Sequence, residues 1–170
     1  MGRKFEKYEC LWFEGPVPPN DIRSYVSVVK ALDISVCGSE GLFGRYNYRD
    51  FMTQGAVDII QPDIARVGGI SEARKITAMA SAFDIPITLH VGLSGPGCRA
   101  ESLQLAPILP RALSTNYEIY FLPKPLHTDI IDRPIERFGK GVPRSTERAR
   151  PELGDKPEGD ERVPGRASAG

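Results

Sequence analysis

Five short apolar runs recur along the first 121 residues of this 170-residue chain. They are separated by stretches in which apolar residues repeat at the three- and four-residue spacing of a helix. Strands that alternate with helices and are apolar on both faces are typical of a parallel sheet covered by helices. The sequence therefore predicts an α/β fold of about five parallel βα units, with strands at residues 8–13, 34–38, 56–61, 85–90 and 116–121.

Local signals predict where the helices begin and end. Asn20 or Asp21 is a suitable N-cap for the first helix, and Gly55 is expected to follow the last turn of the second. Pro107 should shorten or kink the helix that follows the fourth strand. In the helix opened by Ser71 and Glu72, one apolar face is expected from Ile76, Met79, Ala80 and Phe83.

The composition changes at residue 140. Residues 140–170 hold 7 Lys plus Arg, 6 Asp plus Glu, 4 Pro and 5 Gly, with few aliphatic side chains. Such a segment buries too little apolar surface to offset its chain entropy. We therefore predict a folded domain over residues 1–139 and a flexible, disordered C-terminal tail over 140–170, with a binding role for the tail as the alternative.

The charge balance excludes some classes of partner. The 22 basic and 22 acidic residues cancel, which gives no field that would attract nucleic acid or an anionic membrane. No apolar stretch reaches the roughly 18 to 20 residues of a membrane span, and the first ten residues contain no hydrophobic signal region. We expect a cytoplasmic protein. The three cysteines, Cys10, Cys37 and Cys98, are predicted to be buried thiols without a function.

Four acids and a histidine follow the predicted strands in phase. Glu14, Glu40, Asp63 and His90 lie at or just past strand ends, and Glu118 falls within the fifth predicted strand. The intervals between them are 26, 23, 27 and 28 residues, about one βα unit each. Parallel strands present their carboxyl ends on a common face, so these side chains should converge. A single one of them could be an ordinary loop residue, but five in phase indicate a common site.

Two kinds of chemistry are available to such a site. Glu14 and Glu40 offer hard carboxylate oxygens, which suit Mg²⁺. Asp63 can fix the imidazole tautomer of His90 and raise its basicity, which makes His90 a candidate base. A cation and a base together are what removal of a proton beside a carboxylate requires.

Three segments of the sequence carry a family resemblance: "LWFEGPVPPNDI", "CGSEGLFGRYNYRDFMTQGAVDIIQPDIARVGGISEARKI" and "IPITLHVGLSGPG". They resemble the mandelate racemase/muconate lactonizing branch of the enolase superfamily, in particular its sugar-acid dehydratases, over about residues 8–135. The resemblance implies a partial TIM-type (β/α) barrel containing family strands four to eight. It also implies a lyase that acts on a sugar acid or another small carboxylate.

The same resemblance assigns roles to the five residues. Glu14 and Glu40 match Mg²⁺ ligands, and Asp63 and His90 match the catalytic dyad. Glu118 matches a glutamate that hydrogen-bonds the enediolate intermediate. Two positions depart from the family pattern, since Gly15 stands where a glutamate is usual and Ser39 where a glycine is usual, and Ser39 is expected to crowd the strand end.

The resemblance also implies parts that this sequence does not contain. Family members have an amino-terminal capping domain and barrel strands one to three, which supply a third metal ligand. We therefore expect these 170 residues to be a fragment that is inactive alone. They would associate as a homo-oligomer or with the missing barrel half.

Alternatives remain at this point. Racemase or cycloisomerase chemistry would use the same scaffold, a half-barrel could serve as a non-catalytic assembly module, and an unrelated open α/β binding domain would make the acids incidental. The glycine-rich segments 67–71 and 92–97 could each hold a phosphate at a helix N-terminus. Neither has a nucleotide-binding pattern, so turn geometry is the favoured interpretation.

Overall fold

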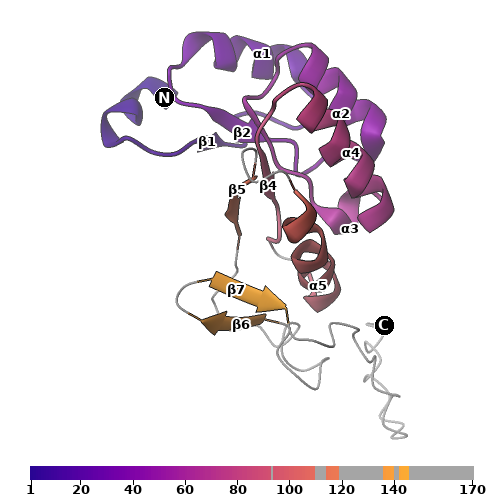
Figure 1. Cartoon of the computed structure of the whole chain (residues 1–170). Helices are drawn as coiled ribbons and strands as arrows, with labels where there is room; N and C mark the ends of the chain where they lie inside the picture. The colour runs from indigo at the N-terminus through magenta and orange to yellow at the C-terminus, as the bar shows by residue number, and fades with distance from the viewer. Residues whose placement is uncertain (93, 110–113, 119–135, 140–141, 146–170) are drawn as a thin grey trace, which may run out of the picture.

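A single parallel sheet organises the protein (Figure 1). The computed structural model describes residues 1–92, 94–109, 114–118, 136–139 and 142–145. The strand order is β1-β2-β3-β4-β5, and every neighbouring pair is parallel. These strands are β1 Phe13–Glu14, β2 Val36–Gly38, β3 Ile59–Ile60, β4 Ile87–Leu89 and β5 Ser114–Tyr117. The predicted α/β fold with five parallel strands is confirmed.

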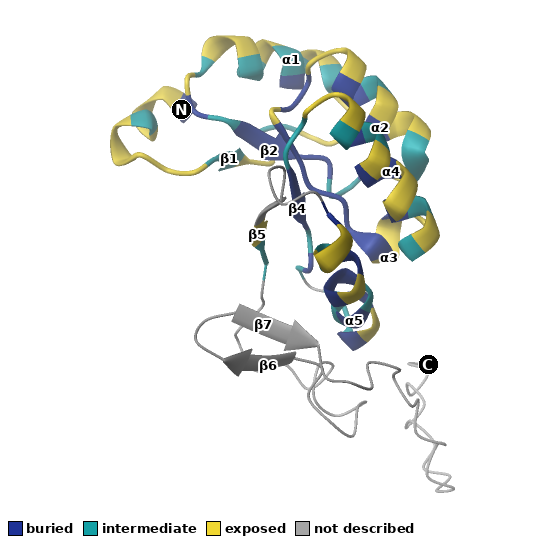
Figure 2. Cartoon of the chain, in the orientation of Figure 1, coloured by how far each residue is buried: buried dark blue, intermediate teal, exposed yellow. Residues whose placement is uncertain are grey.

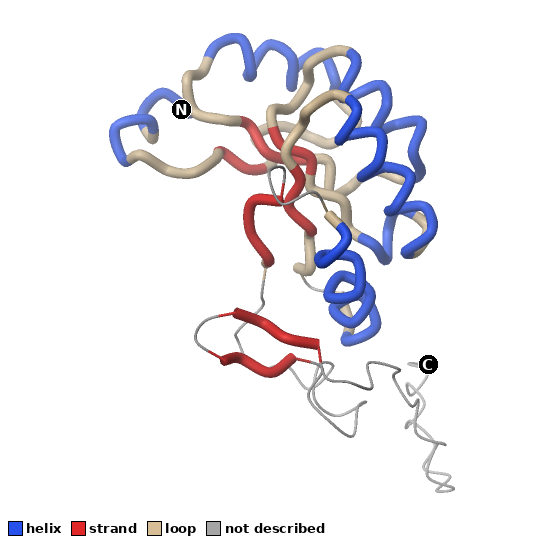
Figure 3. The backbone as a smooth tube through the Cα atoms, in the orientation of Figure 1, coloured by secondary structure: helices blue, strands red, loops and turns tan. Residues whose placement is uncertain are grey.

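Helices cover one side of this sheet, which curls like part of a barrel (Figures 1 and 3). The α-helices are α1 Ile22–Ala31, α2 Gly44–Thr53, α3 Ile64–Val67, α4 Ile70–Ala82 and α5 Pro96–Leu105. Three short 3-10 helices are η1 Gly2–Lys4, η2 Glu6–Tyr8 and η3 Ala106–Ile108. Each pair of consecutive parallel strands is joined through at least one helix, as expected for βα units.

The residues predicted to begin or end helices are found at the helix ends. Asp21 is the N-cap of α1, and its Oδ1 accepts a hydrogen bond from the Ser24 amide at 3.1 Å. Gly55 has a positive φ of 64°, and its amide donates to the Met52 carbonyl, which closes the end of α2. Pro107 lies in η3, directly after α5 ends at Leu105.

The core lies between the sheet and the inner faces of the helices, as the dark blue surfaces in Figure 2 show. The rings of Tyr25 on α1 and Phe51 on α2 meet edge to face with centroids 5.2 Å apart. The strands contribute buried aliphatic side chains such as Val36, Ile60 and Ile87. Burial of each large aliphatic or aromatic side chain contributes roughly 1.5 to 3 kcal/mol, so this layer fixes the strand ends that carry the candidate site.

Three sequence-based expectations about apolar residues are wrong. In the predicted strand 8–13 only Phe13 is in a strand, because η2 ends at Tyr8 and β1 pairs with a single neighbour, β2. Cys10, expected to be buried, is exposed in the segment before β1, whereas Cys37 and Cys98 are buried as predicted. Phe83 is exposed because it is the C-cap of α4, where the chain leaves the helical path.

The segment after β5 contains an antiparallel pair, β6 Glu136–Gly139 and β7 Val142–Ser145. Four residues that the composition assigns to the tail therefore form β7. The other predicted tail residues, 140–141 and 146–170, lie outside the described residues. Among the helices that the structure describes, none is long and apolar enough to cross a membrane.

Candidate active site

The five residues singled out in the sequence all lie at the carboxyl ends of the strands. Glu14 is the last residue of β1, and Glu40 follows β2 by two residues. Asp63 follows β3, and His90 directly follows β4. Glu118, predicted inside the fifth strand, directly follows β5 instead. The parallel register of the sheet therefore brings them to one edge.

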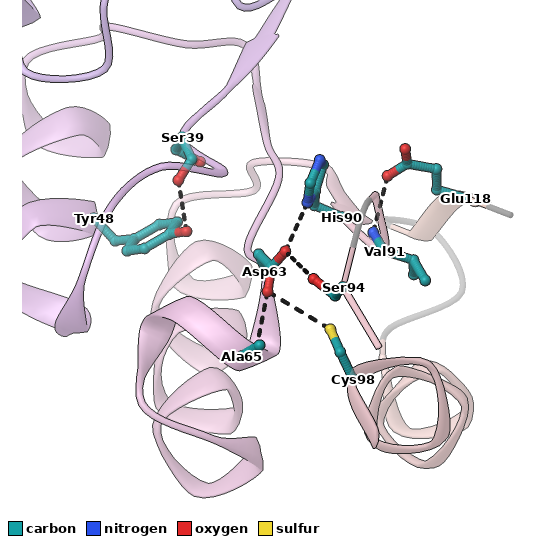
Figure 4. Close-up of polar contacts among 9 residues, drawn as sticks. All are labelled: Ser39, Tyr48, Asp63, Ala65, His90, Val91, Ser94, Cys98 and Glu118. Atoms are coloured by element: carbon teal, nitrogen blue, oxygen red, sulfur yellow. Dashed lines mark hydrogen bonds and ion pairs between the residues drawn. The ribbon is translucent and has the colours of Figure 1, made fainter. Parts of the chain in front are cut away.

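Asp63 and His90 are in direct contact (Figure 4). The Nδ1 atom of His90 lies 2.8 Å from Oδ2 of Asp63. The backbone supports this contact, since the His90 amide donates to the Pro62 carbonyl at 3.1 Å. The Asp63 side chain is 1% exposed and the His90 side chain 18% exposed, so the carboxylate is sealed inside while the ring reaches the surface of the site.

Asp63 is held by three further donors. Its Oδ1 accepts a hydrogen bond from the Ala65 amide at 2.9 Å, which caps α3, and lies 3.6 Å from the Cys98 thiol. Its Oδ2 accepts a second hydrogen bond, from the Ser94 hydroxyl at 3.0 Å. Both carboxylate oxygens are therefore oriented, and the plane of the carboxylate is fixed relative to the imidazole ring (Figure 4).

The electrostatics favour an ionised aspartate beside a basic histidine. Burial on its own would raise the pKa of Asp63, but hydrogen bonds from His90, Ser94 and Cys98 outweigh it and bring the pKa below its ordinary value. Burial would likewise lower the pKa of His90, but the Asp63 hydrogen bond and the charges of Glu118 and Glu40 raise it above its ordinary value. Because Nδ1 donates to Asp63, Nε2 remains to exchange a proton with a ligand.

Gly92 gives the imidazole ring its space. A Cβ atom at this position would lie 2.3 Å from Cε1 and 2.7 Å from Nε2 of His90. Bonded side-chain atoms cannot approach so closely, so any other residue at this position would force the ring or the turn to shift. The ring thus packs against the backbone of the turn that follows β4.

Glu118 lies on the other side of the ring from Asp63 in Figure 4. Its Oε2 accepts a hydrogen bond from the Val91 amide at 2.9 Å, which ties β5 to the residue after His90. The side chain is half-buried. A carboxylate at this place stabilises positive charge on the imidazole.

The two glutamates are less constrained than the dyad. Glu14 is exposed, and its Oε2 accepts a hydrogen bond from the Trp12 indole at 3.2 Å. Glu40 is half-buried, and its Oε2 atom is buried with no hydrogen-bond partner in the described part of the chain. Gly15 follows Glu14, and a Cβ on it would lie 3.6 Å from Oε1 of Glu40, so the end of β1 passes beside this carboxylate. Burial raises the pKa of the intervening Cys37 thiol, and the negative charges of Glu14 and Glu40 raise it further.

The carboxylate oxygens of Glu14 and Glu40 are of the type that binds a hard cation. A buried carboxylate oxygen without a hydrogen-bond partner is costly unless a cation or a water compensates it. Mg²⁺ uses few protein carboxylates and keeps other positions for water and substrate. In the described residues no group of three or more His, Cys, Asp or Glu side chains could hold a metal. Glu14 and Glu40 thus remain the two ligands predicted from the sequence.

Ser39 is accommodated at the end of β2. It is fully buried with a φ of 86°, a backbone conformation that favours glycine. The Tyr48 hydroxyl donates to the Ser39 carbonyl at 2.7 Å (Figure 4). The Ser39 hydroxyl accepts from the Gln61 amide at 3.1 Å. These two bonds hold the strained residue that precedes Glu40, rather than leaving it to crowd the strand end.

Three contributors to the site were not predicted from the sequence. Gly92 and Ser94 lie in the segment 92–97, which was assigned to turn geometry alone, and Cys98 was expected to be a thiol without a function. The contacts of Ser94 and Cys98 with Asp63 join residues that are 31 and 35 positions apart in the chain. The only local signal was the glycine-rich turn directly after His90.

Comparison with known proteins identifies the family of the chain. The family model described as "Enolase C-terminal domain-like" matches residues 1–146. The chain belongs to this family, and its structural neighbours include TIM-barrel members of the enolase superfamily. A mandelate racemase/muconate lactonizing enzyme from Sulfitobacter sp. superimposes with a TM-score of 0.75 at 30% identity, over 85% of this chain and 35% of that one.

Two curated relatives act on sugar acids or their lactones. The D-xylonate dehydratase of Haloferax volcanii is 35% identical over 124 residues, which is 72% of this chain and 29% of the relative. The D-galactarolactone cycloisomerase of Agrobacterium fabrum is 36% identical over 116 residues, which is 68% of this chain and 31% of the relative. The chain thus spans about a third of the length of these relatives.

Proposed function

We propose that this chain supplies the proton-transfer residues, and part of the Mg²⁺ site, of an enzyme that abstracts the α-proton of a sugar acid and eliminates water. The observation that carries the proposal is the 2.8 Å contact between His90 Nδ1 and the buried Asp63 carboxylate. The D-xylonate dehydratase relative supports the choice of a sugar acid and of dehydration.

His90 is the base in this proposal. Neutral His90 donates a hydrogen bond from Nδ1–H to Asp63 and takes the α-proton on Nε2, while the electrons of the C–H bond move into the substrate carboxylate. The imidazolium that forms is stabilised by Asp63 and Glu118. The same proton can then be returned to a β-hydroxyl group, which leaves as water when its C–O bond breaks, while the electrons of the enediolate form the double bond between the α and β carbons. Atoms and charge balance within the site without an oxidant or reductant.

Glu118, Glu14 and Glu40 have the remaining roles in the proposed reaction. The resemblance to the family gives Glu118 a hydrogen bond to the enediolate, and its bond from the Val91 amide fixes the carboxylate for that contact. Glu14 and Glu40 would hold Mg²⁺, which when bound neutralises the growing charge on the substrate carboxylate. The observation that supports this assignment is the buried Oε2 of Glu40, which has no hydrogen-bond partner among the described residues.

We further propose that the 170 residues have no appreciable turnover alone. Two acids would hold Mg²⁺ weakly, since loss of one charged partner costs roughly 1.5 to 3 kcal/mol, or about 10- to 100-fold in affinity. In the described sheet β1 and β5 are edge strands, and open edges favour self-association or pairing with another barrel segment. A homo-oligomer or a complementing half-barrel is therefore expected.

Cycloisomerisation is the second candidate, because the D-galactarolactone cycloisomerase relative has comparable identity. Both reactions can begin with removal of a proton next to a carbonyl group. They differ in their products, so product analysis separates them.

The test compares the chain alone with a joined protein, in which the amino-terminal part of the Haloferax volcanii D-xylonate dehydratase precedes it. Both are assayed with Mg²⁺ against a panel of sugar acids and sugar-acid lactones. We expect His90-dependent dehydration by the joined protein and none by the chain alone. Turnover near 1 s⁻¹ by the chain alone, abolished by His90→Asn, would contradict its expected inactivity. Equal turnover by the joined protein and its His90→Asn variant would contradict the proposed function.

A further inference from the structure

We propose that Ser94 is a positioning residue of the Asp63–His90 dyad, whose hydroxyl shares Oδ2 of Asp63 with the imidazole and so weakens the hold of Asp63 on His90. This inference rests on the proposed function, because it assigns a task to a residue that the proton-transfer scheme above does not use. It also gives the glycine-rich turn after β4 a role beyond turn geometry.

The geometry divides one oxygen between two donors. Oδ2 of Asp63 receives His90 Nδ1 at 2.8 Å and the Ser94 hydroxyl at 3.0 Å. Oδ1 is held separately by the Ala65 amide at 2.9 Å and the weakly donating Cys98 thiol at 3.6 Å. With the Asp63 side chain 1% exposed, bulk water competes little for Oδ2. Among the described residues, the Ser94 hydroxyl is thus the side-chain donor that shares this oxygen with the imidazole.

The charges around the ring show why such a donor matters. The titratable groups that act on His90 are Asp63, Glu118 and Glu40, and all three favour the imidazolium. A base that is already protonated at the working pH cannot accept a substrate proton. A hydroxyl on Oδ2 stabilises the negative charge of Asp63 locally, which reduces its pull on the imidazolium. Ser94 therefore keeps a larger fraction of His90 neutral.

The placement of Ser94 is tied to that of the ring. Gly92, two residues earlier, lies against the His90 ring, and Ser94 immediately precedes the Gly95 N-cap of α5. Cys98 on the first turns of α5 reaches the other oxygen of the same carboxylate. The start of α5 and the residues before it therefore approach Asp63 together, so Ser94 does not contact it in isolation.

The experiment is an NMR titration of the His90 imidazole in the full chain. The sequence contains one other histidine, His127, and a His127→Gln background leaves a single imidazole signal. We expect Ser94→Ala to raise the His90 pKa by about half a unit or more, since the variant loses a hydrogen bond to the charged Asp63 and part of this loss is transmitted to the ring. Ser94→Thr, which keeps the hydroxyl, should restore the original value, and Ser94→Cys should fall between Ser94→Ala and the parent.

An unchanged or lowered pKa in folded Ser94→Ala would overturn the inference. If Ser94→Ala fails to fold, Ser94→Cys decides in the same way, because a thiol fills the site but donates weakly. A purely structural role would affect the unfolding midpoint without this ordered series of pKa values. A parent His90 that titrates at or below its ordinary pKa would instead argue against the dyad and the proposed function. A raised parent value that no Ser94 variant moves would overturn only the role of Ser94.

Discussion

The two halves of the candidate site differ in how far the chain prepares them. At the ends of β3 and β4, the buried Asp63 carboxylate accepts hydrogen bonds from side chains and backbone and holds His90 at 2.8 Å. At the ends of β1 and β2, Glu14 is exposed, and Glu40 has a buried oxygen without a hydrogen-bond partner in the described residues. The described residues hold the proton-transfer half in place, whereas the cation half depends on a cation or on another protein segment.

For Glu14 this difference follows from sheet position. β3 has a strand on each side, and β4 is followed by a turn and helix that fold back on Asp63. β1 has β2 as its only neighbour in the described sheet. Side chains at an edge receive fewer supporting contacts, so their geometry is fixed only when a ligand or another segment arrives. β2 is an interior strand, so for Glu40 the difference lies instead in the buried Oε2 atom, which has no hydrogen-bond partner among the described residues.

The largest expected effect comes from removing the base. In the joined protein, His90→Asn should lower turnover by about 10²- to 10⁴-fold, because general base catalysis contributes about this much. Mg²⁺ affinity, measured by calorimetry, should change little, because His90 is not one of the candidate ligands. A variant that keeps its turnover but loses Mg²⁺ would reverse the assignment of the two halves.

Substitution of Gly92 tests the preorganised half without changing a titratable group. Gly92→Ala would place a Cβ atom 2.3 Å from Cε1 of His90, so the ring or the turn must shift. A misplacement of about 1 Å costs on the order of 10²-fold in rate. Gly97→Ala is the matched control, because nothing lies within 4 Å of its Cβ position. Similar turnover of the two variants in the joined protein would show that ring placement is not critical.

A third prediction concerns the cation half. Glu40→Gln keeps the size of the side chain but removes its charge, and should weaken Mg²⁺ binding by about tenfold or more. The exposed Glu9, in the segment before β1, provides the control variant Glu9→Gln. Calorimetric titration with MgCl₂ measures the Mg²⁺ affinity of each variant of the joined protein. Equal affinities would remove Glu40 from the cation site.

A smaller effect is expected in the pH dependence of stability. The folded-state pKa of His90 is raised, so its stabilisation is present below its unfolded value of 6.5 and lost as pH rises through the folded value. The folded-state pKa of Asp63 is lowered. The stabilisation from Asp63 is therefore present above pH 3.8 and is lost as the pH falls through the folded-state pKa. The pair should therefore contribute most between about pH 4 and 6.5, by about 1 kcal/mol.

Urea unfolding of the chain and of its His90→Gln variant at several pH values measures this contribution. The difference in unfolding free energy should peak in that window and shrink on both sides. A difference that grows steadily above pH 7 would have the wrong sign for this pair.

Much of the fold could be predicted because its signals are local. The spacing of apolar runs, the Asp21 cap and the Gly55 terminator each depend on a few neighbouring residues, and all are confirmed. The strand predicted at residues 8–13 is wrong because an apolar run does not reveal whether a neighbouring strand is present. Only Phe13 has one, in β2.

The sequence predicted only those parts of the site whose residues lie at the ends of neighbouring parallel strands. Asp63 and His90 come from the ends of neighbouring strands, and their contact follows from the parallel order. The contacts of Ser94 and Cys98 depend on how the turn after β4 folds back, which the glycine-rich sequence allows but does not specify. Whether Glu14 and Glu40 share a cation remains a prediction.

The most direct test of the preorganised dyad is the pKa of His90 in the chain without metal, compared with that in Asp63→Asn. NMR titration in the His127→Gln background gives both values. If Asp63 holds His90 as an ion pair, the parent pKa lies above the ordinary 6.5 and falls when the carboxylate becomes an amide. Equal values in the two proteins would show that Asp63 does not control His90, and would contradict the account.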